Sequence, residues 1–300
     1  MKLFAPKYYK KFFCIADKCT HSCCVGWEID IDDETAKKYA ALDCGYGKII
    51  KNSIGMDEAP HFVLGDNERC PHLDGRGLCR IITELGEDYL CEICREHPRF
   101  YNNSPQGKEV GLGMACEEAA RIILSSDEYD VIEEIGTACG EDSKKLIDTS
   151  DIRSEIYSIL KAEHIPYSER LSELHKKFDI STDIFEDDIW REMLSELEYL
   201  DKEHKTLFKS YSSSLETPKD FEKSAERVLA YFIYRHCTSA YDEKEYKAYL
   251  LFCLFLERLF VSVLKENKKV SFATLARIIS EEIEYSEDNT ERIINEIYFA

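Results

Sequence analysis

The sequence predicts a mainly α protein, in which a cysteine-rich and loop-rich N-terminal module with few short strands packs on a C-terminal helical domain. Three observations predict this fold class. Ten of the thirteen cysteines fall between Cys14 and Cys116. The same region is dense in Gly, Pro and Asn, which favour turns over long helices. After about Glu117, apolar residues recur at the spacing of a helix instead.

Strands are expected only in the N-terminal part. Gly26–Ile31 alternates apolar and polar residues with a period of two, and Ala59–Leu64 is a weaker case of the same pattern.

Helices are expected from Glu117 onward, where Glu117–Leu124 starts the first. Thr217 and Pro218 are predicted to cap a helix over Phe221–His236, and Ser271 a helix over Phe272–Ile283. Tyr249–Leu256 is the longest apolar stretch. Charged residues stop it well before the roughly 20 residues that cross a bilayer, so we predict a buried core helix. Two further helical faces are formed by Ile152, Ile156, Ile159 and Leu160, and by Trp190, Met193, Leu194 and Leu197.

With 300 residues, the chain is long enough for two domains that each bury a core. We predict a cysteine-rich module over residues 1–140 and a helical domain over residues 141–300, with the acidic stretch Gly140–Asp151 as the boundary.

The formal net charge of −20 disfavours nucleic acid as a partner, because it repels the phosphate backbone. No secretory signal is apparent at the N-terminus, and no membrane segment is expected. We therefore expect a cytoplasmic protein. In reducing cytosol, grouped cysteines bind metals more often than they form disulfides.

The grouped cysteines predict a metal-binding module. Thiolates are soft ligands of zinc and of iron–sulfur iron. The number of candidates permits two four-ligand sites or one site with spare thiols. His21, His72 and His97 lie close enough in sequence to replace a thiolate, although surface or supporting roles are commoner for histidine. The predicted ligands are Cys14, Cys19, Cys23, Cys24, Cys70, Cys79, Cys91, Cys94 and Cys116.

Three segments carry a resemblance to a known family. They are Arg69–Ile81, Glu84–Phe100 and Gly111–Arg121, preceded by the opening pattern Cys-x4-Cys-x3-Cys-Cys-x2-Trp. Over about residues 8–125 the chain resembles the flagellin lysine-N-methylase (FliB) family, which is itself similar to a wider CxxCxxCC group of iron–sulfur or zinc proteins.

The resemblance implies a cytoplasmic enzyme that transfers methyl groups from S-adenosylmethionine to lysines of flagellin and uses a [4Fe–4S] cluster. By position, eight of the predicted ligands match the wider group, and Cys91 matches the additional cysteine of the methylase pattern. Two alternatives stay open, a non-catalytic zinc or iron–sulfur protein that serves in protein interactions, and a redox protein.

No catalytic or donor-binding residue is assigned from the sequence. Glu109–Gly113 is similar to the glycine loop of Rossmann-type methyltransferases, but no βαβ pattern surrounds it, and we interpret its glycines as a turn that delivers Cys116. The Cys-x3-Cys-x2-Cys motif that Cys19 and Cys23 begin is incomplete, because Gly26 stands where its third cysteine would be. Weaker candidates are Arg95 and Arg99 for a carboxylate or for the cluster's surroundings, and Trp27, Tyr89 and Tyr101 for an aromatic pocket.

Overall fold

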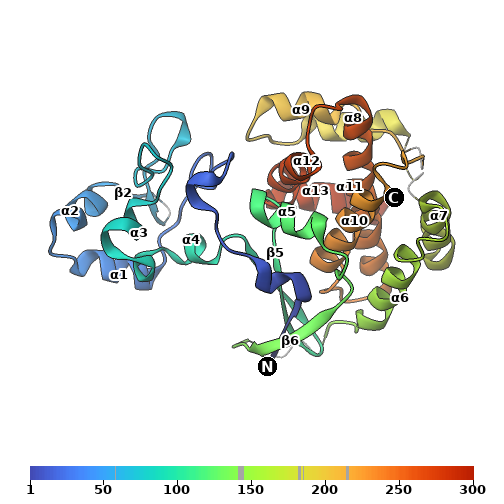
Figure 1. Cartoon of the computed structure of the whole chain (residues 1–300), viewed down its shortest axis with the longest axis horizontal. Coiled ribbons are helices and arrows are strands. Elements are labelled where there is room, and N and C mark those ends of the chain that lie inside the picture. The colour runs from blue at the N-terminus through green and yellow to red at the C-terminus, as the bar shows by residue number, and fades with distance from the viewer. Residues whose placement is uncertain (58, 141–144, 182–183, 185, 214–215) are drawn as a thin grey trace. The chain divides into compact units, whose positions relative to one another are not determined.

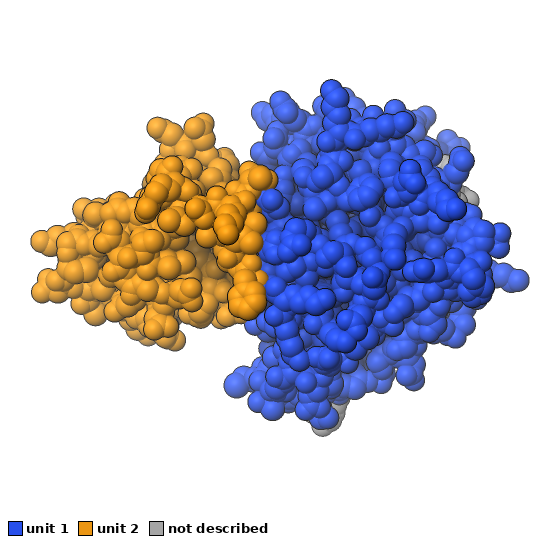
Figure 2. All heavy atoms as spheres, viewed as in Figure 1, with its two compact units in different colours: residues 1–12, 99–300 blue, residues 13–98 orange. Residues whose placement is uncertain are grey.

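A computed structural model describes residues 1–57, 59–140, 145–181, 184, 186–213 and 216–300. The chain forms two compact units, which Figure 2 colours separately. Unit 1 comprises residues 1–12 and 99–300, and unit 2 comprises residues 13–98. These units differ from the division at residue 140, which stays a prediction about domains. Part of its boundary stretch, residues 141–144, lies outside the described residues.

Unit 2 is built from short elements joined by loops, as the density of turn residues predicts. Asp32 caps the first helix by accepting a hydrogen bond of 3.0 Å from the backbone N–H of Thr35. The elements are η2 (Ala16–Lys18), α1 (Asp33–Ala41), α2 (Gly45–Asn52), β2 (Ile54–Met56), β3 (Pro60–Phe62), η3 (Asp66–Glu68), α3 (Arg80–Leu85), η4 (Glu87–Tyr89) and α4 (Glu92–Glu96).

The two predicted strands of unit 2 have different outcomes. The weaker case, Ala59–Leu64, contains β3, which pairs antiparallel with β2. The prediction of a strand over Gly26–Ile31 is wrong, because this segment makes only isolated bridges at its ends, Val25 with Arg69 and Asp30 with His61. The alternation still predicts correctly which residues are buried, since Ile29 and Ile31 belong to the core of the unit.

Unit 1 contains a four-stranded sheet that the sequence analysis missed. Its strands are β1 (Lys2–Pro6), β4 (Arg99–Ser104), β5 (Gly107–Leu112) and β6 (Ile132–Thr137). They lie in the order β4-β5-β1-β6, with β1 parallel to β5 and the other pairs antiparallel. Strand β5 is buried along most of its length, and it leads through a turn into helix α5.

Helices form the rest of unit 1 and confirm that the protein is mainly α (Figure 1). They are η1 (Lys7–Lys11), α5 (Glu117–Ser125), α6 (Ser150–Leu160), α7 (Tyr167–Phe178), α8 (Asp187–Glu196), α9 (Lys202–Phe208), α10 (Glu222–His236), α11 (Glu243–Glu266), α12 (Phe272–Ile279), the π-helical segment η5 (Ser280–Glu284) and α13 (Glu287–Phe299).

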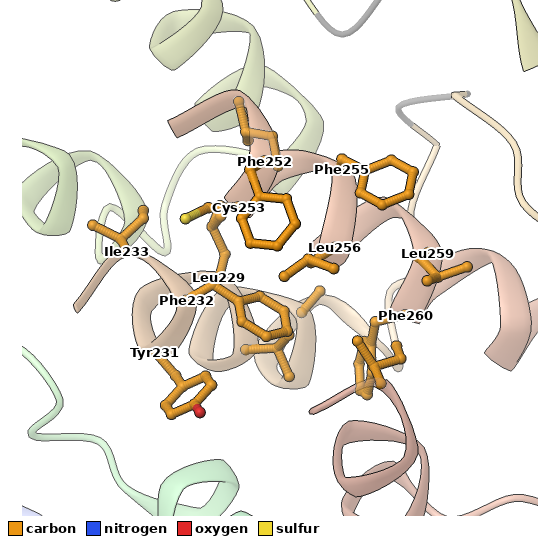
Figure 3. Close-up of a cluster of buried hydrophobic side chains, with 14 of the residues drawn as sticks. Leu229, Tyr231, Phe232, Ile233, Phe252, Cys253, Phe255, Leu256, Leu259 and Phe260 are labelled. Atoms are coloured by element: carbon orange, nitrogen blue, oxygen red, sulfur yellow. The ribbon is translucent and has the colours of Figure 1, made fainter. Parts of the chain in front are cut away.

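The core of unit 1 lies where α10 packs on α11. Figure 3 shows Leu229 and Phe232 of α10 against Phe252, Leu256 and Leu259 of α11, all of them buried. The apolar stretch within α11 is therefore a core helix, as predicted. None of the described helices is both long enough and apolar enough to span a membrane.

The observed first residues of two helices can be compared with the predicted caps. The Ser271 side chain accepts a hydrogen bond of 3.1 Å from the backbone N–H of Thr274, which confirms this cap. The cap at Thr217 and Pro218 is wrong, because α10 begins only at Glu222. Thr217 instead accepts a hydrogen bond of 2.8 Å from Arg258, so its hydroxyl is used to satisfy a buried guanidinium.

Candidate functional site

Unit 2 brings five of the nine predicted ligand cysteines together around its hydrophobic core. Cys70 and Cys91 are buried, and the other three pack against the same core. The five are free thiols: Cys24, Cys70, Cys79, Cys91 and Cys94. They come from the loop before α1, the loop after η3 and the starts of α3 and α4, so separate loops converge as the sequence predicts.

The five sulfur atoms influence one another's ionisation. Burial, with a smaller contribution from the neighbouring Cys24, Cys79 and Cys91, raises the pKa of Cys70 to about 12. A hydrogen bond with Cys91 raises the pKa of Cys94, and the same bond lowers the pKa of Cys91. Because the negative charge of each thiolate opposes the ionisation of its neighbours, several of them can ionise together only beside a compensating cation.

Cys24 is the most acidic thiol of the group. A hydrogen bond with Cys23 lowers its pKa to about 7, and the Arg69 guanidinium adds to this effect. The Tyr39 hydroxyl donates to the carbonyl oxygen of Tyr89 at 2.6 Å and lies 3.6 Å from the sulfur of Cys91. Polar groups thus accompany the sulfur atoms in an otherwise apolar region.

The donor set fits zinc or iron–sulfur iron in its chemistry, since soft sulfur donors converge in a dry, apolar region. Its present arrangement is not a coordination shell. Within the part of the chain that the structure describes, no three Cys, His, Asp or Glu side chains surround one point as a metal requires. The convergence of the thiols is therefore observed, and the ion remains a proposal.

The other four predicted ligands are not among the residues of this core, although Cys23 hydrogen-bonds to Cys24. Cys14 and Cys23 are exposed in unit 2, and the thiol of Cys19 donates to the carbonyl oxygen of His21 at 2.5 Å. Cys116 belongs to unit 1, where it is the residue before α5. A shared centre between Cys116 and the thiols of unit 2 stays a prediction.

His72 does not have a ring nitrogen available for a metal. Its Nδ1 is 2.9 Å from the Tyr46 hydroxyl, and its Nε2 is 3.0 Å from the Ser53 hydroxyl. The ring is fully buried and meets Phe62 edge-on at 4.5 Å. Burial lowers the pKa of His72 to about 4, so the imidazole is neutral. Both ring nitrogens of His72 are thus used within the protein, which disfavours the alternative in which His72 replaces a thiolate.

The weaker sequence candidates are divided between the units. Arg99 of unit 1 donates from Nε to the Tyr9 hydroxyl at 2.9 Å, whereas Arg95 of unit 2 has its Nε 3.7 Å from a carboxylate oxygen of Glu96. Of the three aromatic candidates, Trp27 and Tyr89 belong to unit 2 and Tyr101 to unit 1. Each set is therefore divided between the two units.

Gly111, within β5, and Gly113, directly after it, both serve internal packing, and of the two only Gly113 lies in the predicted turn. A methyl group at Gly111 would overlap the ring of Phe100, and one at Gly113 would overlap the hydroxyl of Tyr285. The space beside each glycine is thus filled by an aromatic side chain of unit 1. This segment does not have the open space that a bound methyl donor needs.

Sequence reasoning missed a group of buried charges near this turn. The π-helical segment η5 buries Glu281, Glu282 and Glu284, each less than 9% exposed. For two of them the signal was available, because Glu281 and Glu282 interrupt a helical apolar pattern that runs from Leu275 to Ile283. Carboxylates at buried positions indicate specific partners rather than a solvated face.

Comparisons with known proteins agree with the resemblance. Residues 107–300 match the model of the FliB lysine N-methylase C-terminal domain. The flagellar biosynthetic protein FliU of Salmonella muenchen is 30% identical over 127 residues, which cover 40% of this chain and 75% of that protein. No solved structure matches the chain.

Two further relatives are named lysine-N-methylase. Those of Salmonella typhimurium and Salmonella choleraesuis are each 29% identical over 136 residues, which cover 43% of this chain. The matched region spans 34% of the length of these two proteins.

Proposed function

Because the chain belongs to the FliB lysine N-methylase family, we propose that it is a protein-lysine N-methyltransferase that modifies flagellin. The observation that carries the proposal is the family match over residues 107–300, which covers most of unit 1. The relatives support the substrate, since two are named lysine-N-methylase and one is named a flagellar biosynthetic protein.

The proposed methyl donor is S-adenosylmethionine, and the proposed cofactor is a [4Fe–4S] cluster, with zinc as the alternative. The five convergent thiols of unit 2 support a sulfur-bound metal. Four of the five thiols Cys24, Cys70, Cys79, Cys91 and Cys94 would supply the ligands of one centre. Burial raises the pKa of Cys70 and Cys79, so a cation would be needed to hold several of the thiols as thiolates. When bound, such a centre supplies charge compensation and, if it contains iron, electron transfer.

The protein's own part in methyl transfer is to hold a neutral lysine amine in line with the donor methyl group and to keep water away, since positioning and desolvation supply most of the catalysis. The acidic surface, with a net charge of −20, favours encounters with a lysine-bearing partner. No single acid or base is assigned to this step.

The test is methylation of flagellin by protein purified without oxygen. We expect flagellin from a motile relative to gain the mass of one methyl group, or multiples of it, on lysines when S-adenosylmethionine is added. Flagellin incubated without the protein is the control. Unmodified flagellin, with protein that is folded and retains its metal, would contradict the proposal.

Metal analysis of the same sample distinguishes the cofactors. Iron with an equal amount of acid-labile sulfide supports the cluster, and zinc without sulfide supports the alternative.

A further inference from the structure

Unit 1 buries the carboxylate of Glu284 completely and surrounds it with three partners from helix α10. The Tyr231 hydroxyl lies 3.1 Å from its Oε2. The Arg235 guanidinium and the His236 imidazole lie 3.2 Å and 2.7 Å from its Oε1. The carboxylate therefore joins the end of the π-helical segment η5 to the last two turns of α10.

The charges of Glu284 and Arg235 stabilise each other. Burial alone would raise the pKa of Glu284, but Arg235 and His236 bring it below its ordinary value. Burial alone would lower the pKa of Arg235, but Tyr231 and Glu284 raise it. Since a buried ion pair contributes little net stability, its value lies in fixing one arrangement of the side chains.

The directions of the hydrogen bonds follow from the donors available. An ionised carboxylate only accepts, so the proton of the Tyr231 hydroxyl points to Glu284. The two lone pairs of that hydroxyl accept from the backbone N–H of Met114 at 3.1 Å and from Nη1 of Arg235 at 3.1 Å. Tyr231 thus links the buried carboxylate directly to the turn between β5 and α5.

Arg235 also lies beside this turn, against Gly113. Its guanidinium lies over the rings of Phe100 and Tyr285, 4.8 Å and 4.6 Å from their centroids, and it donates to the carbonyl oxygen of Glu284 at 3.3 Å. Gly113 lies against the Tyr285 hydroxyl and the Arg235 guanidinium, which leaves no room for a side chain at this position.

This turn ends at Cys116. The backbone N–H of Cys116 bonds to the carbonyl oxygen of Gly113 at 3.3 Å, and its own carbonyl oxygen accepts from Ala120 in the first turn of α5 at 2.9 Å. The place of Cys116 is therefore set by the path of the chain from Gly113 onward.

We propose that Glu284 is a positioning residue, which fixes the Gly113–Cys116 turn through Tyr231 and Arg235 and so determines where the Cys116 thiol is presented. The proposal goes beyond the methyl transfer proposed above, because it concerns the place of this thiol and not what the thiol binds.

The test compares two buried carboxylates of unit 1. Glu284→Gln removes the charge that holds the turn. Glu257→Gln is the matched control, because Glu257 is also fully buried and also pairs with an arginine and a tyrosine, Arg258 at 2.8 Å and Tyr167 at 3.2 Å. The readout is the rate at which iodoacetamide alkylates Cys116 in the folded protein, measured by peptide mass spectrometry relative to exposed Cys139 in the same sample.

We expect Glu284→Gln to raise the relative alkylation rate of Cys116 by about tenfold, since a hydrogen bond to a charged group contributes enough for a factor of that order. Glu257→Gln is expected to leave it within about twofold, because the partners of Glu257, Arg258 and Tyr167, are not those that hold the turn. The direction is the same with or without a metal on Cys116, because loosening the turn exposes the thiol in both cases.

A second pair of variants keeps the test decisive if Glu284→Gln fails to fold. Tyr231→Phe removes only the hydroxyl that links Met114 to Glu284. Tyr157→Phe removes a comparable buried hydroxyl, which donates to the carbonyl oxygen of Ala230 at 3.0 Å. An unchanged Cys116 rate in Tyr231→Phe, or an equal rise in either control, overturns the proposal. Because neither metal nor methylation is measured, failure here is distinct from failure of the proposed enzyme activity.

Discussion

The strand that leads to the Cys116 turn is anchored by a buried ion pair, and breaking that pair has a calculable cost. Glu109 of β5 and Arg153 of α6 form two parallel hydrogen bonds of 2.7 Å and 2.8 Å, and their side chains are only 7% and 8% exposed. Arg153 also donates to Thr238 at 3.1 Å and lies over the ring of Tyr234. Burial alone would lower the pKa of Arg153, but Glu109 raises it, so the guanidinium stays charged.

Glu109→Gln keeps the shape of the side chain but leaves a buried guanidinium without a counter-charge. Removing one partner of a buried pair lowers the free energy of unfolding by about 3–5 kcal/mol. For a unit of this size, each kcal/mol shifts the melting temperature by roughly 2–4 °C, so the expected decrease is about 6–20 °C.

The assay is thermal and urea unfolding of the single variant, of the double variant Glu109→Gln with Arg153→Met, and of Glu133→Gln. The double variant should recover more than half of the loss, because no unpaired charge remains. Glu133 pairs with Lys10 at an exposed site, and its replacement should change the unfolding free energy by less than about 1 kcal/mol. A loss below about 1 kcal/mol in Glu109→Gln, or a double variant less stable than the single one, would refute the reasoning.

Three further outcomes are expected. Gly113→Ala should cost about 1–3 kcal/mol of unfolding free energy through overpacking, whereas Gly45→Ala, with open space around it, should change it by less than about 0.5 kcal/mol. Cys91→Ala should reduce the metal content of the purified protein, and Cys44→Ala, outside the thiol group, should leave it unchanged. Burial lowers the pKa of His236 below its ordinary value near 6.5, so the unfolded chain binds the extra proton and stability falls as pH drops below that value. His236→Gln should flatten this decline in urea midpoints measured between pH 7.5 and pH 5.5, and an unchanged slope would count against it.

The sequence predicted the helices well because their signals are local. The apolar period of α11 and the cap at Ser271 depend on residues within one or two turns of each other. The sheet was missed because its pairing is not local. Lys2 pairs with Gly107, more than a hundred residues along the chain, and neither β1 nor β5 shows the alternation of a half-buried strand.

The site was predictable to the level of grouping and no further. The spacing of the cysteines predicted nine metal ligands in one module, and five of them lie at the core of unit 2. Their binding of a metal stays a prediction. Sequence alone offered no reason to disfavour His72 as a metal ligand, because only the structure shows Tyr46 and Ser53 at its two ring nitrogens. Nor could it find Glu284, whose partners come from a helix about fifty residues earlier.

The activity and the cofactor rest on separate observations, and this separation decides how the results should be interpreted. The family match begins at Gly107, the first residue of β5, and so contains only Cys116 among the nine predicted ligands. Membership of the family therefore supports lysine methylation without supporting a metal, whereas the thiol group of unit 2 supports a metal without supporting methylation. Methylation of flagellin by protein from which the metal has been removed would support the proposed activity and would leave the thiols with a structural role only. If removal of the metal abolishes activity while unit 1 stays folded, the metal and the methylation belong to one mechanism.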